Sequence, residues 1–527
     1  MTKMDTRPGP RPAEVWQHTA RDASGTADSL QGKRSESEAV SLKMPHAKEP
    51  RGRKTSGRAL RIATVLCVVL VAPILSARAS AGLAKKRVAS GPPFATTSVS
   101  SNHRYLLDQY GHPYMIVGDS AHTLSVYEST SEMNAYFANR EAHGFNAVLV
   151  QLIVGKYIDA NNLRNSTNFA TYDGITPFTV AGDISKPNPV YFDRIQTMVR
   201  LAERHGITLF LDPADTGQLL DSSSFLADNG ATKDFDYGVF LGKTFKKFPN
   251  IVWSSGNDYQ QWGPKNDAYV LGIARGIRSV DPKQLQTVEL NPGEISSDDP
   301  AWAAFVNLNG EYDNYSPYAE VLAGYNFGPS TIPVFGVENN YEFENNIGVN
   351  PGTTQNLRRQ EYWTMTSGAT GLLYGNHFTW DDPSWANEET HLDTPGVKQL
   401  QYMRKLFRSV AWYDLVPDQG HAFVTAGYGT FQDQGVESSD DYVTAALTPN
   451  GSLGIAYLPQ PTTLTVDMTK MRGPTKARWY DPTTGTFKVI GTIANTGSHS
   501  FTSPPDHRDG SDDWVLVLQA SSASRGT

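Results

Sequence analysis

The chain has 527 residues, with 46 Lys and Arg against 54 Asp and Glu. This length allows one large catalytic domain and a smaller second domain. The mildly acidic balance, and the lack of a Lys/Arg stripe interleaved with aromatic residues in the folded part, argue against a nucleic-acid partner.

Residues 1–81 are expected to be a disordered amino terminus followed by a signal peptide. A basic stretch precedes an apolar run of about 16 residues, and small residues suited to cleavage follow it. An uncleaved membrane anchor is the alternative, but Pro73 and the shortness of the run favour export with cleavage. The only cysteine, Cys67, lies in this run. The mature protein would therefore be secreted, without a disulfide and without stable membrane association; Met44 is an alternative translation start.

Residues 82–102 are rich in Ser, Thr, Gly and Pro and are expected to form a linker. From residue 103 onward, short apolar runs alternate with segments of helical periodicity. The predicted strands are Tyr114–Val117, 145–151, 207–213, 251–253, 285–292, Tyr312–Tyr318, 333–338 and 371–376. The predicted helices are Ser131–His143, Tyr191–His205, Phe235–Phe248, Ala268–Val280, Ala319–Tyr325, Leu357–Ser367 and Thr394–Val410.

This alternation is typical of a (β/α)8 barrel, in which buried parallel strands are joined by helical crossovers. We assign the barrel to residues 103–415. From about Gly420 the pattern changes to short alternating segments with turns at PNG and TTG, which predicts an antiparallel β-sandwich over residues 416–520. Residues 521–527 form a tail.

Polar residues fall at or just after the ends of the predicted barrel strands. Because those ends face one pocket, we expect these side chains to converge. The residues are Asp119, Gln151, Asp212, Asn257, Asp258, Asn291, Glu338 and Asn376.

Asp258 and Glu338 are the predicted catalytic pair. Each follows an apolar run, in NIVWSSGNDY and PVFGVENNY, at the predicted fourth and seventh strands. Retaining glycoside hydrolysis needs one carboxyl group that donates a proton and one that attacks, held about 5 to 5.5 Å apart. A strand-end acid can instead cap a helix or pair with arginine, but both acids in one barrel favour catalysis.

Further residues are predicted to bind substrate through hydroxyl contacts or stacked rings. High aromatic content suits a carbohydrate site, although large cores also use aromatics. Ordinary structural roles for Asp119, Asn257, the two histidines and Trp380 remain open at this point. The predicted substrate-binding residues are Asp119, His122, Gln151, Asn257, Tyr259, Tyr341, Asn376, His377 and Trp380.

Other chemistries lack their signatures. The sequence has no zinc-type His/Glu spacing, no GxSxG elbow and no phosphate-binding glycine loop, so we expect no metal and no cofactor. The stretch DHRDGSDDW loosely resembles a calcium loop, but acid-rich turns of this kind are usually solvated. The pair Arg358 and Arg359 is expected to lie on a solvated helix face.

The segments GDSAH, YFANREAHGFNAVLVQ, NIVWSSGNDY, GVENNYE and SGATGLLYGNHFTW resemble those of apiosidase-like glycoside hydrolases. The later ARWYDPTTG resembles the β-domain usually attached to them, named after a collagen-binding region. The resemblance covers about residues 103–519. It implies a (β/α)8 barrel that cleaves pentofuranosyl-type sugars with retention, with Asp258 as acid/base and Glu338 as nucleophile.

The chain departs from the family pattern at two places. His122 stands where the family commonly has Trp, and the acid-bearing motif reads SGND where GGD is common. Both changes affect the pocket floor and therefore the sugar. The leading hypothesis is a secreted retaining glycoside hydrolase of an apiose- or arabinose-like sugar; the alternatives are a non-catalytic carbohydrate-binding protein, a hydrolase of a different sugar class, or inverting chemistry.

Overall fold

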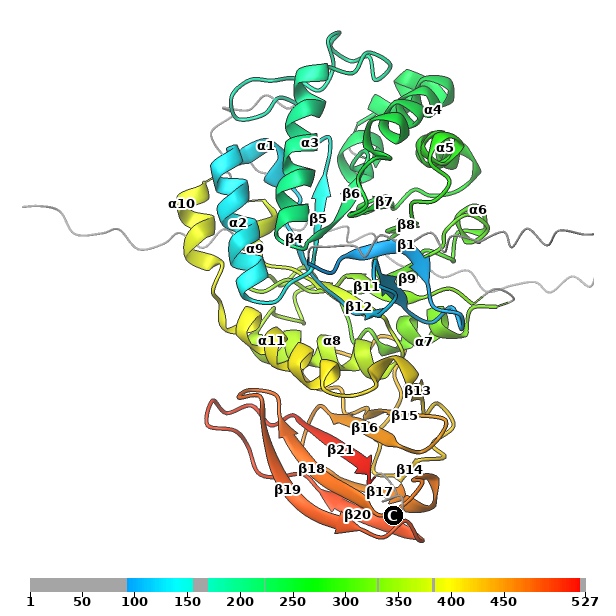
Figure 1. The fold of residues 1–527 in the computed structure, drawn as a ribbon, viewed down its shortest axis with the longest axis vertical. Helices are drawn as coiled ribbons and strands as arrows, with labels where there is room; N and C mark the ends of the chain where they lie inside the picture. The colour runs from blue at the N-terminus through cyan, green and yellow to red at the C-terminus, as the bar shows by residue number, and fades with distance from the viewer. Residues whose placement is uncertain (1–91, 155–168, 222, 329–330, 382–383, 522–527) are drawn as a thin grey trace, which may run out of the picture. The chain divides into compact units, whose positions relative to one another are not determined.

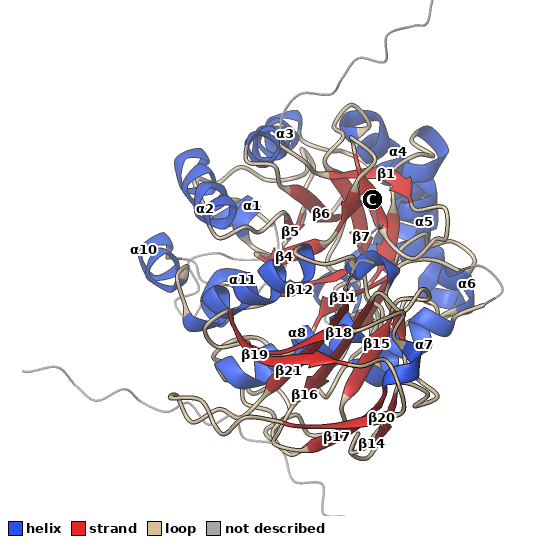
Figure 2. Cartoon of the chain, turned by 60° about the horizontal axis from the view of Figure 1, so that its bottom comes forward, coloured by secondary structure: helices blue, strands red, loops and turns tan. Residues whose placement is uncertain are grey.

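The computed structural model describes residues 92–154, 169–221, 223–328, 331–381 and 384–521. Its first domain is a barrel of eight parallel strands, and Figures 1 and 2 show helices as an outer ring around the strands. The strands follow the order β8-β7-β6-β5-β4-β12-β11-β10. The predicted (β/α)8 barrel is therefore confirmed.

The barrel strands are short and buried. They are β4 (Ile116–Ser120), β5 (Ala147–Gln151), β6 (Thr208–Asp212), β7 (Ile251–Ser255), β8 (Gln286–Val288), β10 (Asn309–Tyr312), β11 (Val334–Glu338) and β12 (Gly371–Tyr374). The helices are α1 (Leu124–Tyr127), α2 (Thr130–Ala142), α3 (Pro189–Arg204), α4 (Phe225–Phe245), α5 (Pro264–Val280), α6 (Pro300–Ala303), α7 (Tyr318–Asn326), α8 (Thr354–Thr366), α9 (His377–Trp380), α10 (Trp385–Glu388) and α11 (Pro395–Arg408).

Several crossover helices begin at residues that cap them. The Ser129 side chain accepts a hydrogen bond from the Glu132 N–H while the Glu132 carboxylate accepts from the Ser129 N–H, which fixes the start of α2. Asn188 caps α3 and Thr394 caps α11, and a proline follows each cap at the first helical position.

Ser296 closes the barrel between β8 and β10. Its hydroxyl donates to the Val288 carbonyl and accepts from the Gly310 N–H at 2.8 Å. The residue follows the short strand β9 (Glu294–Ile295), which pairs antiparallel with β10. A side chain thus supplies hydrogen bonds that a direct β8–β10 ladder would otherwise make.

The sixth barrel strand lies at residues 309–312, and the predicted strand Tyr312–Tyr318 is wrong. The true strand reads NGEY and carries none of the β-branched residues that mark strands. It is nevertheless fully buried, because Asn309 pairs with Ser297 and Gly310 lies against Ser296 and Thr287.

The predicted linker is also corrected. Residues Ala95–Val99 form strand β1, which pairs antiparallel with β2 (Leu106–Asp108), and β2 pairs with β3 (Pro113–Tyr114). This small sheet begins the folded body before residue 103. The signal-peptide prediction concerns residues outside the described ones.

The second domain contains two antiparallel sheets, which confirms the predicted sandwich. The larger has the order β13-β15-β16-β21-β18-β19 and the smaller β14-β17-β20. Their strands are β13 (Val416–Pro417), β14 (Val424–Ala426), β15 (Thr444–Leu447), β16 (Leu453–Leu458), β17 (Thr463–Asp467), β18 (Thr475–Asp481), β19 (Thr486–Ile493), β20 (Ser498–Thr502) and β21 (Trp514–Ala520).

Strand β16 serves two hydrophobic cores, so both of its faces are buried. Ile455 and Tyr457 pack in a cluster with Tyr362 and Trp363 of barrel helix α8. The alternate residues Ala456 and Leu458 belong to the sandwich core. Since successive strand side chains point to opposite faces, the large sheet joins the two domains through an apolar interface.

A buried ion pair reinforces this interface. Arg358 of α8 is 1% exposed and pairs with Asp513, which is 0% exposed and also accepts from the Tyr457 hydroxyl at 3.1 Å. Gln355 donates to Asp512 at 2.7 Å. The arginine expected on a solvated face and the acids of the calcium-like loop are therefore interdomain partners.

Replacing Arg358 with methionine is expected to destabilise the protein by about 3 to 5 kcal/mol, because Asp513 would be left buried and unpaired. Urea denaturation followed by tryptophan fluorescence measures this. Lys233→Met is the control: its partner Asp183 lies nearer the surface, so the loss should be much smaller. Equal losses for the two variants would contradict the account.

Several buried carboxyl groups among the described residues have a raised pKa. Burial raises the pKa of Asp234 and of Glu320, the first to about 8 and the second to about 9. Burial likewise raises the pKa of Glu361 and Glu437 well above the usual range. These groups bind protons more tightly in the folded than in the unfolded chain.

The free energy of unfolding should therefore fall as pH rises from about 4 to about 8. Between the unfolded and the folded pKa values, the folded state holds more protons, so the slope of stability against pH is negative. Asp234→Asn removes one such group and should gain stability over wild type at pH 8, with little difference near pH 4. Urea midpoints across this range provide the test, and a midpoint that rises with pH would contradict the prediction.

Candidate active site

Asp258 lies at the barrel mouth on a tight turn after β7. Gly256, Asn257 and Asp258 have φ values of 107°, 63° and 56°. Thr216 holds the turn, its hydroxyl donating to the Gly256 carbonyl at 2.7 Å and to the Asn257 carbonyl at 3.0 Å. The strained turn thus carries a half-buried carboxyl group clear of the strand ladder.

Glu338 reaches the same mouth through a β-bulge. Along β10 and β11, Glu311 pairs with Gly336, but Tyr312 pairs with Glu338, so β11 contains one extra residue. Val337 already faces the barrel interior, and simple alternation would turn Glu338 outward. The bulge places Glu338 in register with the inward-facing Tyr312.

A third carboxyl group, Glu289, joins these two. It follows β8 and accepts a hydrogen bond from the Asp258 N–H at 2.9 Å. Burial and the charges of Glu289 and Asp258 raise the pKa of Glu338 well above its usual range. Burial and the charge of Asp258 raise the pKa of Glu289 to about 8. The mouth therefore holds three carboxyl groups whose negative charges disfavour one another.

Two tyrosines contact the predicted catalytic carboxyls. Burial raises the pKa of Asp258, and a side-chain hydrogen bond with Tyr312 partly offsets that rise. Tyr341 makes a side-chain hydrogen bond with Glu338, and its hydroxyl lies 3.2 Å from His122 Nε2. The hydroxyls orient both carboxyls and favour their charged forms.

Aromatic rings form one wall of the site. His122 packs edge-on against Tyr341 and Trp380, with ring centroids 6.2 and 5.8 Å away. Burial lowers the pKa of His122 to about 4, so the ring is neutral near pH 7. Glu344 anchors this wall by accepting from the Trp380 indole at 2.6 Å. Such rings suit the apolar face of a sugar.

Residues 100–414 match the family described as "Apiosidase-like, catalytic domain". The chain belongs to the apiosidase-like family. Residues 416–519 match a second family, described as "Putative collagen-binding domain of a collagenase". Membership of the first family makes this chain a glycoside hydrolase. No curated protein sequence matches it.

Solved glycoside hydrolases share the fold of this apiosidase-like chain. A glycoside hydrolase family 5 structure from Bacteroides vulgatus superimposes with a TM-score of 0.67 at 20% identity, covering 83% of this chain and 95% of that one. A second structure, described as "Glycoside hydrolase", gives 0.66 at 20% identity, covering 82% and 97%. At this identity the likeness concerns the fold.

Three residues predicted to bind substrate instead support the apiosidase-like barrel. Asp119 faces outward from β4, where Arg140 Nε lies 3.0 Å from its carboxylate and Tyr136 donates at 2.6 Å. Tyr259 donates to Asp267 at 2.8 Å and packs in the core outside the barrel. Asn376 caps α9 through a bond from the Phe378 N–H at 2.8 Å. Each of these side chains thus binds a protein group in the structure, and its contact with substrate stays a prediction.

The other predicted residues lie on or near the mouth. Asn257 is buried, and its Oδ1 has no hydrogen-bond partner. Gln151 ends β5 on the inward face shared with Ala147 and Leu149. His377 is exposed and pairs with Glu344 at 3.0 Å, at the rim beside Trp380.

Sequence reasoning missed Glu289, Tyr312 and Glu344. Glu289 stands in VELNP, where the Asn-Pro pair resembles a turn, although Leu285, Thr287 and Glu289 share one strand face. Tyr312 was hidden by the misplaced sixth strand. Glu344 lies in a loop without periodicity, so only the structure reveals that it contacts Trp380.

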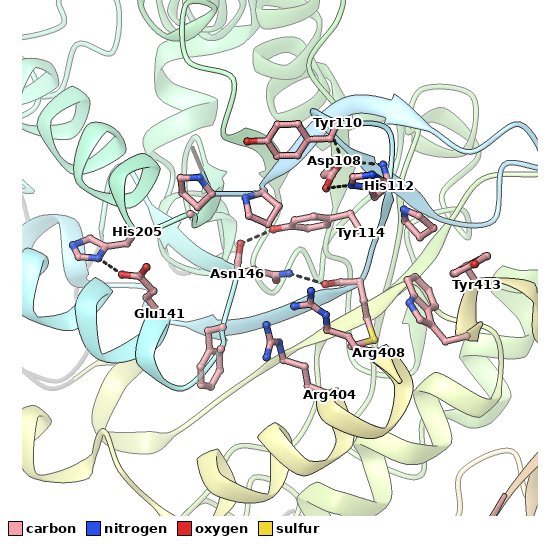
Figure 3. Close-up of a pocket in the computed structure, with 18 of the residues that line it drawn as sticks. Asp108, Tyr110, His112, Tyr114, Glu141, Asn146, His205, Arg404, Arg408 and Tyr413 are labelled. Carbon is pink, nitrogen blue, oxygen red and sulfur yellow. Dashed lines mark hydrogen bonds and ion pairs between the residues drawn. The ribbon is translucent and has the colours of Figure 1, made fainter. Parts of the chain in front are cut away.

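A separate cavity of about 550 Å³ lies at the other end of the barrel. Its lining includes Met115 and Asn146, which precede β4 and β5, and Tyr114 donates to the Asn146 carbonyl at 2.6 Å. Figure 3 shows Arg404 and Arg408 reaching toward it. The amino-terminal face of such barrels serves stability rather than chemistry, and none of the predicted site residues lines this cavity.

Within the described ranges, no group of three or more His, Cys, Asp or Glu side chains is arranged to hold a metal ion. No helix in this part of the chain is long and apolar enough to cross a membrane.

Proposed function

We propose that this chain is an exported, retaining glycoside hydrolase of a pentofuranosyl-type sugar, apiose- or arabinose-like, in a polysaccharide or glycoconjugate. One observation carries the proposal: Asp258 follows barrel strand β7 and Glu338 ends β11, the charge of Asp258 raises the pKa of Glu338, and both charges raise the pKa of Tyr312 between them. The family description supports the sugar class. The basic and apolar amino-terminal sequence supports export.

In the first step, Asp258 gives its proton to the leaving oxygen while Glu338 attacks the anomeric carbon and forms a glycosyl–enzyme ester. In the second, Asp258 removes a proton from water, which displaces Glu338 from the sugar and restores both groups. The tyrosine bonds to the two carboxyls stabilise the negative charge that each carries in turn.

The wall of His122, Tyr341 and Trp380 would bind the sugar ring. His122 is neutral near pH 7, so it offers a hydrogen bond without adding charge beside Glu338. Asn257, whose Oδ1 lacks a partner, would accept from a sugar hydroxyl.

Release of reducing sugar from a panel of apiose- and arabinose-containing glycans tests this function. Proton NMR of the first-formed product should show the anomeric configuration of the substrate. Inverted product would exclude Glu338 as nucleophile, and binding without turnover on every glycan would exclude hydrolysis of this sugar class. Cleavage only of hexosides would retain the reaction but overturn the sugar assignment.

A further inference from the structure

Glu289 has a position that the proposed pair of catalytic carboxyls does not require. It follows β8, and Leu285 on the same strand face packs in the barrel interior. The side chain therefore points into the mouth. Glu289 is 1% exposed, so a carboxyl group has been buried there at a cost that demands a role.

The backbone at Asp258 needs support from outside its own strand. Asn257 and Asp258 both have positive φ, a left-handed conformation that residues other than glycine adopt at a cost, although Asn and Asp adopt it more readily than most. Thr216 and the Gly217 N–H bind the carbonyls of Gly256 and Asn257. The N–H of Asp258 itself is bound by the Glu289 carboxyl group at 2.9 Å.

The end of β8 also fits closely against this turn. A Cβ atom added to Gly256 would lie 2.2 Å from the carbonyl oxygen of Glu289. Any larger residue at position 256 would push the two strand ends apart. The main chain and the side chain of Glu289 therefore both contact the segment that carries Asp258.

We propose that Glu289 is a positioning residue of the retaining reaction, whose carboxyl oxygen holds the Asp258 N–H and so fixes the direction in which Asp258 presents its proton to the leaving group. The proposal rests on the proposed function of Asp258 and Glu338. It adds a third carboxyl that contacts neither the broken bond nor the attacking atom.

The charges around Glu289 indicate how a third carboxyl is tolerated. Asp258, Asp215 and Glu338 face it, and Tyr312 lies within reach of its charge. Burial and Asp258 raise its pKa to about 8. Near neutral pH it is therefore a neutral acid, which still accepts through its carbonyl oxygen but adds no negative charge beside the nucleophile.

Two substitutions separate the hydrogen-bond acceptor of Glu289 from its length and charge. Glu289→Gln keeps a carbonyl acceptor of the same length, and Glu289→Met keeps the length without an acceptor. We expect Gln to stay within about tenfold of wild-type kcat/KM below pH 7, and Met to lose about 100-fold, mostly in kcat, because misplacement of about 1 Å costs this much. Glu361→Gln is the matched control, because Glu361 on α8 is another buried carboxyl group with a raised pKa. This substitution should leave kcat/KM unchanged.

The pH profile tests the neutral state. The acid limb of the profile of kcat/KM against pH is set by ionisation of Glu338. If Glu289 is uncharged in the working enzyme, this limb should lie at the same pH in Glu289→Gln as in wild type. A shift of that limb to lower pH by one unit or more would show that wild type carries a charge at Glu289, and would overturn this part of the proposal. This test uses only wild type and the Gln variant, so it remains decisive even if the Met variant does not fold.

Crystal structures of the two variants test positioning without activity. The left-handed turn at residues 257 and 258 should persist with Gln and relax with Met. An unchanged turn and full kcat/KM in the Met variant would overturn the inference. An inactive wild type would instead overturn the proposed function, while relaxation of the turn in the Met variant would still support the contact.

Discussion

Replacing Glu338 with alanine is expected to lower kcat/KM for hydrolysis by about 10⁴-fold or more. No other side chain of the bulged strand β11 reaches this place in the mouth, so the strand offers no second carboxylate to attack the anomeric carbon. Removal of a nucleophile that acts with a partner costs on this scale. Initial rates on the substrate the wild type cleaves best provide the measurement.

A small external anion should restore part of this activity. The alanine leaves space beside Tyr341, which azide or formate can enter to attack the sugar from the vacated face. With an activated leaving group, azide should give a glycosyl azide of inverted configuration. Residual activity above about a tenth of wild type, unchanged by azide, would exclude Glu338 as nucleophile.

Loss of fold would not explain the effect of this substitution. Burial is the main cause that raises the pKa of Glu338 well above its usual range, so its removal relieves the cost of burying a carboxyl group. Glu338→Ala should therefore unfold at the same urea concentration as wild type or at a higher one. Glu361→Gln again serves as the control for removing a buried carboxyl.

Replacing Asp258 with alanine should have an effect that depends on the leaving group. General acid catalysis contributes about 10² to 10⁴-fold, so natural glycosides should lose on that scale. Aryl glycosides with acidic leaving groups need no proton, and their first step should change little. Rates on a series of leaving groups of known pKa measure the dependence.

The pH profile of this variant offers an independent check. Burial raises the pKa of Asp258, so wild type should lose activity at the alkaline side as this proton is lost. The alanine variant has no such proton, and its alkaline limb should flatten. Equal losses on all leaving groups with an unchanged alkaline limb would contradict the role of Asp258.

The barrel was predictable because its strands are apolar on both faces and its helices carry the 3.6 period. The strands at β5, β6 and β7 are runs of Val, Leu, Ile and Phe with clear ends. The sixth strand failed because NGEY depends on tertiary contacts with Ser296 and Ser297 for its stability. Local propensity carries no trace of those contacts.

The positions of Asp258 and Glu338 at or just after strand ends followed from the sequence, but the faces to which the other predicted side chains point did not. A strand end fixes how far along the barrel a residue lies, whereas the face to which it points depends on alternation and bulges. Asp119 points to α2 for this reason, and Glu338 points inward only because of an extra residue in β11. The same alternation could have identified Glu289.

The ion pair between Arg358 and Asp513 could not be predicted because it depends on how the two domains pack. Arg358 and Asp513 lie 155 residues apart, and each sits in a stretch of polar residues typical of solvated surface. Only the packing of α8 against the large sheet buries them together. A polar stretch of sequence can therefore belong to a buried interface when its charged residues pair with charges of opposite sign on the other domain.

Peptide mapping of the Asp258→Ala variant, quenched during turnover of an activated aryl glycoside, tests the central claim most directly. Without a general base, the second step slows and the glycosyl–enzyme accumulates. Mass spectrometry should find one glycosyl residue added to the peptide that contains Glu338. A label on any other residue, or no covalent adduct while inverted product forms, would contradict the assignment of Glu338 as the nucleophile.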